Sequence, residues 1–452
     1  MRIGIVGWGL EAQSAYRFFG SEHDYLIVSE AAQDDFPPES ETVKIRYLAE
    51  KAPAGIGGQV QDLSYLEGIN QCDKIVYQPT AYFNLRKYFR DNEQFWTKAT
   101  TAYDIFFENC PSQNIIGVTG TKGKGTTSTL IAKILKAQGR PTHLGGNIGT
   151  PILDLLPDIK QEDWVVWELA NFQLKPASHS PHIAVCLMIT GEHLDWHPDM
   201  SDYIEAKTNL FKHQSPRDIA IYFAKDENSK KIASASPGIK VPYFKPPGVY
   251  VRDDGMVVLG SNELEILHKS EVKLLGEHNL QNICAAATAV VEAVGSLDKA
   301  KAVLSSFSGL EHRLELVREF EDVKYYDDSF ATTPDSAIVA LKAFEQPKVV
   351  ILGGSDKGIP FNTLADEVVK NNVRQAIVIG ETAEKIAALL KDRGFAEVTL
   401  GLEKMADIVE AARKAAQPGN VVLLSTGCAS FGLFKDYKDR GNQFKAAVRA
   451  LV

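Results

Sequence analysis

Residues 117–129 read GVTGTKGKGTTST and stand between an apolar stretch, NIIGVT, and a helical one, TLIAKILKA. This order predicts a strand, a glycine-rich loop and a helix that begins near Thr126. Glycines let successive backbone N–H groups converge on an anion, and the helix adds the positive end of its dipole. Lys124 supplies a mobile positive charge. The loop therefore predicts a site for nucleotide phosphates, with ATP as the expected ligand.

The spelling of this loop departs from the standard P-loop. Val118 stands at the usual first glycine, and Gly125 rather than Ser or Thr follows the lysine. A plain glycine-rich turn with an incidental lysine is the alternative interpretation. Threonine hydroxyls are suitable Mg²⁺ ligands, and either of two tandem threonines fits that role. The candidate nucleotide-binding residues of the loop are Gly120, Thr121, Gly123, Lys124, Gly125, Thr126 and Thr127.

Further chemistry-bearing residues follow two downstream strand patterns. Glu168 comes directly after the apolar run WVVW, and MITGEHLDWH places His193, Asp195 and His197 after another. Lys207 follows in a helical segment, YIEAKTNLF. Because parallel sheets present ligands at the carboxyl ends of their strands, an acidic residue there suits Mg²⁺. Hydrogen-bonded histidines and a solvated lysine are the alternative.

Three successive α/β units organise the chain, since strand and helix signals alternate throughout. In the first unit GWGLEA, with Glu30 at the end of the next strand, is a weak dinucleotide fingerprint. A nucleotide-diphosphate site or a plain helix-packing turn is favoured there over nicotinamide or flavin binding. The five cysteines are far apart and never spaced as C-x-x-C, which predicts reduced, mostly buried thiols.

Charge and hydropathy exclude several classes of function. The net charge of −9, without a long basic block, argues against a nucleic-acid partner. No apolar run is long enough to cross a bilayer, and the N-terminus lacks the features of a signal peptide. We therefore expect a cytoplasmic monomer that acts on small molecules.

Several short motifs in a fixed order resemble the Mur ligase family over nearly the whole chain. They include GVTGTKGKGTTST, GGNIGTPIL, ELANFQL, EHLDWH, YIEAK, LLGEHNLQN, LEHRLE, DDSFATTPDS, GGSDKG and LLSTGCASFGLFKDYKDRGNQF. The resemblance implies an α/β fold with three domains: an N-terminal Rossmann-like domain for the UDP substrate (1–108), a central P-loop ATPase (109–308) and a C-terminal Rossmann-like domain for the amino acid (309–452).

The resemblance also implies a reaction and its site residues. The family forms an acyl phosphate on a carboxylate with ATP and two Mg²⁺ ions, and an amine then attacks it. The branch that the motifs resemble joins D-glutamate to UDP-N-acetylmuramoyl-L-alanine in peptidoglycan precursor synthesis. The implied catalytic residues are Lys124, Glu168, His193 and Lys207, and the implied metal ligands are Thr126, Glu168, His193 and Lys207, the last as a carbamate. The implied ATP contacts beyond the loop are Asn147, Asn282, Arg313 and Asp328, and the implied D-glutamate contacts are Thr332, Lys357, Ser430 and Tyr437.

Departures from the family pattern lie mostly on the side of the nucleotide-peptide substrate. Gln78, Pro79 and Thr80 replace a Ser-Pro-Gly turn, Ala170 replaces a serine, and Phe330 stands where a lysine is usual. The loop GTKGKGTT is spelled as in folylpolyglutamate synthases, which are relatives. Two alternatives therefore stay open: another Mur or folylpolyglutamate-type amide ligase with a different acceptor, and a nucleotide-binding protein without ligase activity.

Overall fold

The computed structural model describes residues 1–33, 35–49, 62–146, 150–192, 196–274, 276–356 and 359–452. The chain divides into two compact units, residues 1–307 and 308–452. The boundary lies next to Ser308, one residue before the third unit expected from sequence. All sheets except one small hairpin sheet and one edge strand are parallel, as the alternating strand and helix pattern predicts.

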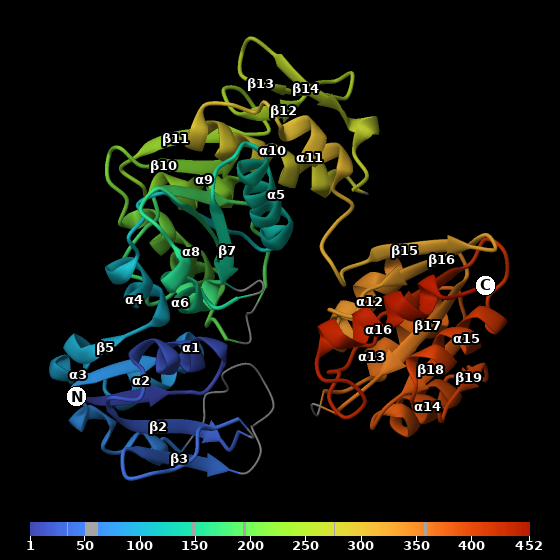
Figure 1. Cartoon of the computed structure of the whole chain (residues 1–452), viewed down its shortest axis with the longest axis horizontal. Coiled ribbons are helices and arrows are strands. Elements are labelled where there is room, and N and C mark those ends of the chain that lie inside the picture. Colours follow the sequence, from blue (N-terminus) through green and yellow to red (C-terminus); the bar gives the residue numbers. More distant parts are fainter. Residues whose placement is uncertain (34, 50–61, 147–149, 193–195, 275, 357–358) are drawn as a thin grey trace. The chain divides into compact units, whose positions relative to one another are not determined.

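The first unit begins with a five-stranded parallel sheet in the order β3-β2-β1-β4-β5 (Figure 1). Its strands are β1 (Arg2–Val6), β2 (Asp24–Ala31), β3 (Val43–Ala49), β4 (Lys74–Tyr77) and β5 (Ala99–Thr100). The accompanying helices are α1 (Leu10–Phe19), α2 (Tyr82–Tyr88), α3 (Glu93–Lys98) and α4 (Ala102–Asn109). Strands β1 and β4 are apolar and buried along most of their length, as parallel strands covered on both faces must be.

The same unit continues into a six-stranded parallel sheet in the order β11-β10-β9-β6-β8-β7. Its strands are β6 (Ile115–Thr119), β7 (Thr142–Gly146), β8 (Trp164–Glu168), β9 (Ile183–Cys186), β10 (Ile219–Phe223) and β11 (Ile239–Tyr243). Its helices are α5 (Lys124–Ala137), α6 (Ile152–Leu155), α7 (Asn171–Leu174), α8 (Met200–Lys212), α9 (Glu227–Ser234), α10 (Glu277–Val294) and α11 (Ala300–Ser306). An antiparallel sheet of β12 (Val249–Val251), β13 (Met256–Leu259) and β14 (Leu264–His268) is inserted before α10.

The two larger sheets of this unit share a hydrophobic core. Ala15 and Val76 from the first sheet region belong to the same buried cluster as Ile115 and Trp167 from the second. Asp154 adds polar contacts between them, because its carboxylate accepts hydrogen bonds from Ser14 Oγ at 2.8 Å and from Arg17 at 2.7 Å. The first unit is therefore one packed body.

The second unit is a six-stranded sheet in the order β15-β16-β20-β17-β18-β19, with β15 antiparallel. Its elements are β15 (Glu315–Phe320), β16 (Val323–Asp327), α12 (Pro334–Lys342), β17 (Lys348–Gly353), α13 (Asn362–Lys370), β18 (Val373–Ile379), α14 (Ala383–Asp392), β19 (Val398–Thr399), α15 (Met405–Ala415), β20 (Val421–Leu424) and α16 (Tyr437–Arg449). Alternate residues of β17 enter different cores: Val350 and Leu352 one, Val349 and Ile351 the other. This period of two shows that helices cover both faces of the sheet.

One expectation from composition is confirmed within the described residues. All five cysteines are buried and unbonded to one another. None of the helices there combines the length and the apolar character that crossing a bilayer requires.

Candidate active site

The glycine loop joins β6 to α5 in the first unit, and two of its glycines are required by sterics. Gly120 has φ +150°, and a Cβ there would lie 2.6 Å from Leu187 Cβ. Gly123 has φ +88°, and a Cβ there would lie 2.1 Å from Asn282 Oδ1. Any larger residue would thus collide with a neighbour. Helix α5 begins at Lys124, two residues earlier than predicted, because Gly123 already serves as its N-cap.

Lys124 folds back over the loop that precedes it. Its Nζ donates to Gly120 O at 3.0 Å and to Thr121 O at 2.9 Å. No side chain caps the N-terminus of α5, so the first-turn N–H groups and the ammonium group face the same place. This arrangement suits the oxygens of a phosphate chain.

Lys207 reaches the same loop from helix α8. Its side chain is fully buried, and its Nζ donates to Gly120 O at 3.1 Å and to Thr119 Oγ1 at 3.5 Å. The Nζ also lies 4.5 Å from the centre of the Tyr203 ring. Burial, together with the nearby charge of Lys124, lowers the pKa of Lys207 to about 7. A large fraction of this amine is therefore neutral near neutral pH.

Glu168 ends strand β8 beside the loop. Its partner in the sheet register is Val118 of β6, two residues before Gly120, and its side chain is 5% exposed. Of the other predicted residues near this edge, His193 and Asn147 lie outside the described residues. The structure therefore brings Lys124, Lys207 and Glu168 to one end of the central sheet.

Asn282 and the tandem threonines complete this side of the loop. Helices α5 and α10 run side by side in Figure 1, and Asn282 of α10 packs against Gly123. The Thr127 hydroxyl is buried and donates to Asn282 Oδ1 at 3.5 Å, whereas Thr126 is half-buried. The two threonines therefore have different environments, which the sequence left open.

In the second unit, the segment that carries Arg313, before β15, is joined to Asp328, directly after β16. Asp328 is 5% exposed, and its carboxylate accepts from Ser425 Oγ at 2.7 Å and from Leu314 N at 3.1 Å. Burial raises the pKa of Asp328 to about 7. The guanidinium carbon of Arg313 lies 4.5 Å from the centre of the Phe330 ring.

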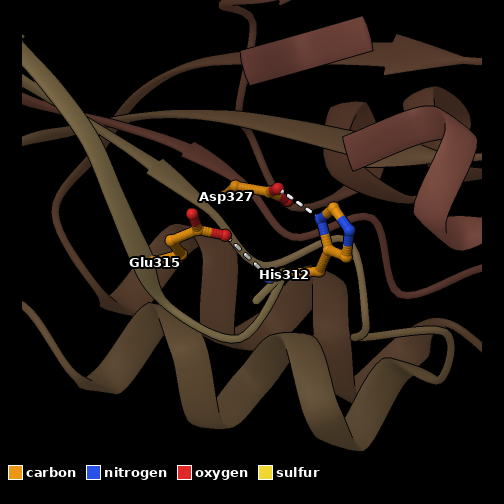
Figure 2. Close-up of side chains that lie close together, drawn as sticks. All are labelled: His312, Glu315 and Asp327. Carbon is orange, nitrogen blue, oxygen red and sulfur yellow. Dashed lines mark hydrogen bonds and ion pairs between the residues drawn. The ribbon is translucent and has the colours of Figure 1, made fainter. Parts of the chain in front are cut away.

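A buried hydrogen-bond network supports this turn (Figure 2). His312 Nδ1 and Asp327 Oδ2 are 2.7 Å apart, and Glu315 Oε2 accepts from the His312 backbone N–H at 2.9 Å. Three such side chains together can hold a metal ion. Here, however, both carboxylates already accept hydrogen bonds from His312, and Glu315 also pairs with Lys445 at 3.2 Å. The group therefore fixes the turn that carries Arg313.

The predicted amino-acid contacts lie on loops at the carboxyl edge of the same sheet and at the start of α16. Thr332 follows the turn after β16, and Ser430, 4% exposed, follows β20. Tyr437 opens helix α16, with its ring edge-on to Phe330 at a centroid distance of 5.4 Å. Lys357 lies outside the described residues.

Comparison with known proteins identifies the family. The model for the Mur ligase middle domain matches residues 118–290, and that for the Mur ligase glutamate ligase domain matches residues 312–428. A UDP-N-acetylmuramoylalanine–D-glutamate ligase from Clostridium kluyveri is 35% identical over 99% of this chain and 96% of its own length. The chain belongs to the Mur ligase family.

Other Mur ligases agree with this result. A UDP-N-acetylmuramoylalanine–D-glutamate ligase from Symbiobacterium thermophilum is 42% identical over 75% of each chain. Among solved structures, the UDP-N-acetylmuramate–alanine ligase MurC from Thermotoga maritima covers 100% of this chain and 99% of its own, at a TM-score of 0.55 and 17% identity. The MurF ligase from Thermotoga maritima in complex with ADP covers 99% and 95%, at a TM-score of 0.53 and 18% identity. These structures share the α/β fold of this chain.

In the first sheet of this Mur ligase, the glycine turn after β1 is covered by a side chain. Gln78 Oε1 accepts from Gly9 N at 2.8 Å, and the same side chain lies against Gly7. Glu30, the acidic residue of the weak dinucleotide fingerprint, accepts from Asn84 Nδ2 at 2.7 Å. Both motif elements are thus engaged in contacts within the protein.

Two residues that matter to the geometry of this Mur ligase have roles that sequence reasoning did not supply. Thr121, predicted to bind nucleotide, donates its N–H to Met188 O at 2.9 Å and pairs its hydroxyl with Tyr203 at 3.0 Å. Its hydroxyl contact with Tyr203 therefore joins the loop to helix α8. Arg440 was not singled out at all: fully buried, it donates to Ser329 Oγ and O at 2.8 Å and to Cys428 O at 3.2 Å.

Arg440 donates hydrogen bonds to both of the loops that carry Phe330 and Ser430, through Ser329 and Cys428. Burial lowers the pKa of its guanidinium to about 10, yet the group still has three protein acceptors. Nothing in the helical sequence DYKDRGNQF distinguishes this arginine from its solvent-exposed neighbours. Only the packing of α16 against the sheet shows that it points inward.

Proposed function

We propose that this Mur ligase joins D-glutamate to UDP-N-acetylmuramoyl-L-alanine at the expense of ATP, through an acyl-phosphate intermediate, and that it acts as a monomer on small molecules. The observation that carries the ligase chemistry is the convergence of two lysines from different helices on one carbonyl. Lys124 and Lys207 donate to Gly120 O at 3.0 Å and 3.1 Å. Simple nucleotide binding needs the first lysine and gives no reason to bury the second.

The loop fits the phosphates of ATP. Gly123 and Gly120 leave no room for a side chain, so backbone N–H groups line the cradle. The first turn of α5 has no capping side chain, and Lys124 adds a cation beside it. Asn282, packed against Gly123, is the side chain we assign to the adenine side. Phosphoryl transfer between two anions needs charge neutralisation and positioning, which these groups supply.

Mg²⁺ fits the same end of the sheet. Glu168 is a buried carboxylate at the strand end, and Thr126, the less enclosed of the two threonines, offers a hydroxyl. We assign these two residues, with His193 and a carbamylated Lys207, to two Mg²⁺ ions. When bound, the ions neutralise charge on the phosphates. Asn147 is assigned to the γ-phosphate side of the same site.

Carbamylation of Lys207 is supported by its surroundings. The reaction with CO₂ requires a neutral amine, and the buried Nζ, with a pKa of about 7, supplies one. The product replaces an ammonium, which divalent cations repel, with hard oxygen ligands. Tyr203 and Gly120 hold the side chain at a fixed angle toward the loop.

The substrates are assigned to domains as follows: the UDP moiety to residues 1–108, ATP to 109–308 and D-glutamate to 309–452. In the last, Thr332, Lys357, Ser430 and Tyr437 receive the amino acid, because a lysine and hydroxyls suit its two carboxylates. Arg313 and Asp328 contact ATP from the same domain.

The deciding experiment is an ATP-dependent phosphate-release assay over a matrix of acceptors and amino acids. We expect release with UDP-N-acetylmuramoyl-L-alanine and D-glutamate together. D-alanine should be at least ~10-fold worse, since losing a charged partner costs about 1–3 kcal/mol or more per buried group. Release with a folate acceptor instead would assign the chain to another amide ligase. The acceptor needs this direct test because Gln78 covers the glycine turn after β1, in the domain assigned to the UDP moiety.

A nucleotide-binding protein without ligase activity would bind ATP yet release no phosphate with any pair in the matrix. ATP binding by calorimetry, run on the same preparation, separates that outcome from inactive protein. Equal rates with D-glutamate and D-alanine would contradict the assigned amino-acid pocket while leaving the reaction class intact.

A further inference from the structure

The backbone on either side of Arg313 is held in an unusual conformation. His312 has φ 60° and Leu314 has φ 45°, although neither is glycine. Such left-handed residues are uncommon and persist where surrounding contacts fix them. Here the contacts are the His312–Asp327 pair at 2.7 Å and the hydrogen bond from Leu314 N to Asp328 at 3.1 Å. The turn therefore sets the position of the Arg313 Cα.

The side chain of Arg313 is oriented differently, by an aromatic ring. Arg313 is exposed, and within the described part of the chain no carboxylate forms an ion pair with it. Its guanidinium carbon lies 4.5 Å from the centre of the Phe330 ring. A cation over an aromatic face is attracted by the negative face of the ring quadrupole. Phe330 is thus the contact that holds the far end of this side chain.

Phe330 is itself fixed from two directions. Its backbone N–H donates to His312 O at 2.9 Å, which joins its loop directly to the turn that carries Arg313. Its ring meets the ring of Tyr437 edge-on, at 5.4 Å and an interplanar angle of 88°. This T-shaped geometry is one that aromatic pairs prefer. One ring therefore contacts both Arg313 and Tyr437.

We propose that Phe330 is a positioning residue of the ligase reaction, which aims the Arg313 guanidinium at ATP and couples it to Tyr437 on the amino-acid side. The proposal rests on the proposed function for the roles of Arg313 and Tyr437. A neutral ring cannot itself bind phosphate, so Phe330 acts through Arg313. This differs from a lysine at the same position, which would bring a charge of its own.

The test replaces Phe330 with phenylalanines that carry one, two and three ring fluorines. Fluorine withdraws charge from the ring face and weakens the cation contact while changing the ring's shape little. The KM for ATP should rise with each fluorine, and Phe330→Leu should raise it about two- to fivefold with kcat little changed. Phe330→Tyr should restore the value of the unmodified chain.

A second Arg–Phe stack provides a matched control. The Arg318 guanidinium carbon lies 4.6 Å from the centre of the Phe320 ring on strand β15, and no proposed substrate contact uses that pair. Phe320→Leu should leave the KM for ATP unchanged. A flat fluorine series, or a Phe330→Leu variant that lowers kcat and the melting temperature together without a change in KM, overturns the proposal.

The design separates this proposal from the proposed function. If the unmodified chain uses a different amino acid or acceptor, the D-glutamate assignment fails, and the fluorine series is then run on the reaction observed. A KM for ATP that still rises with fluorination supports Phe330 as a positioning residue in that reaction. Activity with D-glutamate but no effect of fluorine overturns the role of Phe330 alone.

Discussion

The predicted site residues lie in two regions, a first end in residues 1–307 and a second end in residues 308–452, and these two regions are built by different means. In the first unit the phosphate loop is shaped by local sequence: glycines that tolerate no Cβ, a lysine five residues beyond the strand and a helix that begins at that lysine. In the second unit the loops that carry Phe330 and Ser430 have little local signature and are joined by Arg440, about 110 residues along the chain from its contact Ser329. The first end therefore follows from the spacing of residues in the sequence. The second end depends on tertiary contacts.

The largest expected effect tests the first end. Lys124→Ala should lower kcat by about 10³-fold or more, because it removes a cation from developing phosphoryl charge. The fold should survive, since Lys124 is half-buried and its side chain donates to two carbonyls of a surface loop rather than packing in a hydrophobic core. Lys122→Ala, an exposed lysine of the same loop, is the matched control and should retain activity. Near-normal phosphate release by well-folded Lys124→Ala would remove the loop from the mechanism.

The next largest effect is expected on substitution of Lys207, which should lower activity and raise stability. Lys207→Met should abolish turnover yet raise the melting temperature, because a buried ammonium is costly and no carboxylate among the described residues forms an ion pair with it. The pKa of Lys207 is about 7 in the folded chain and 10.5 for an ordinary lysine, so between these values the unfolded chain binds more protons. The free energy of unfolding of the unmodified chain therefore rises with pH between these two pKa values. The advantage of Lys207→Met should be largest at or below pH 7 and shrink by pH 9.

That measurement needs protein stripped of CO₂ and divalent metal, since carbamylation changes the charge of Lys207. Adding bicarbonate and Mg²⁺ to the unmodified chain should restore activity, most readily above pH 7 where the amine is neutral. A bare amine at Lys207 in the mass spectrum of active, metal-loaded enzyme would contradict the carbamate. A melting-temperature difference that grows with pH would contradict the sign of the pKa shift.

These expectations also mark how far sequence reasoning reaches. Lys124 and Glu168 were found because glycine spacing and strand ends are local patterns, whereas Lys207, inside a helix, was assigned a role through the family resemblance. The structure brings all three to one sheet edge. Thr121 was grouped with the nucleotide contacts because it stands in the motif, but its N–H and hydroxyl bond to Met188 and Tyr203. Which loop residue faces the ligand depends on neighbours far along the chain.

At the second end, even less of the local geometry could be predicted from the sequence. Arg440 sits in a helix with many charged residues, and its burial follows from how α16 packs on the sheet. The left-handed backbone at His312 and Leu314 could not be predicted from residue type, because neither residue is glycine or asparagine. Phe330 was noticed only as a departure from the family's lysine. Its stack on Arg313 required coordinates.

Arg440→Met sharpens the contrast at the second end. It removes three hydrogen-bond donations and leaves buried carbonyls of Ser329 and Cys428 with fewer partners, so we expect a loss of about 2–4 kcal/mol in the free energy of unfolding. The KM for D-glutamate should rise more than that for ATP, because the Ser430 loop moves. Arg449→Met, on the exposed face of the same helix, is the control. Equal effects from both variants would mean that the two loops do not depend on Arg440.

The smallest expected effect returns to the first end and asks whether the loop glycine is needed for its backbone angle or for its contact. Gly123 and Gly139 share a positive φ, +88° and +74°, but a Cβ at Gly123 would meet Asn282 Oδ1 at 2.1 Å, whereas none of the described atoms lies within 4 Å of one at Gly139. Gly139→Ala should therefore show only the backbone cost, about 1 kcal/mol. Gly123→Ala should cost about 1–2 kcal/mol more and raise the KM for ATP, because Asn282 must move away from the loop. Chemical denaturation and ATP titration of both variants measure the difference. If the two alanine variants lose the same stability and bind ATP equally well, the contact between the loop and α10 contributes nothing, and the first end depends on backbone conformation alone.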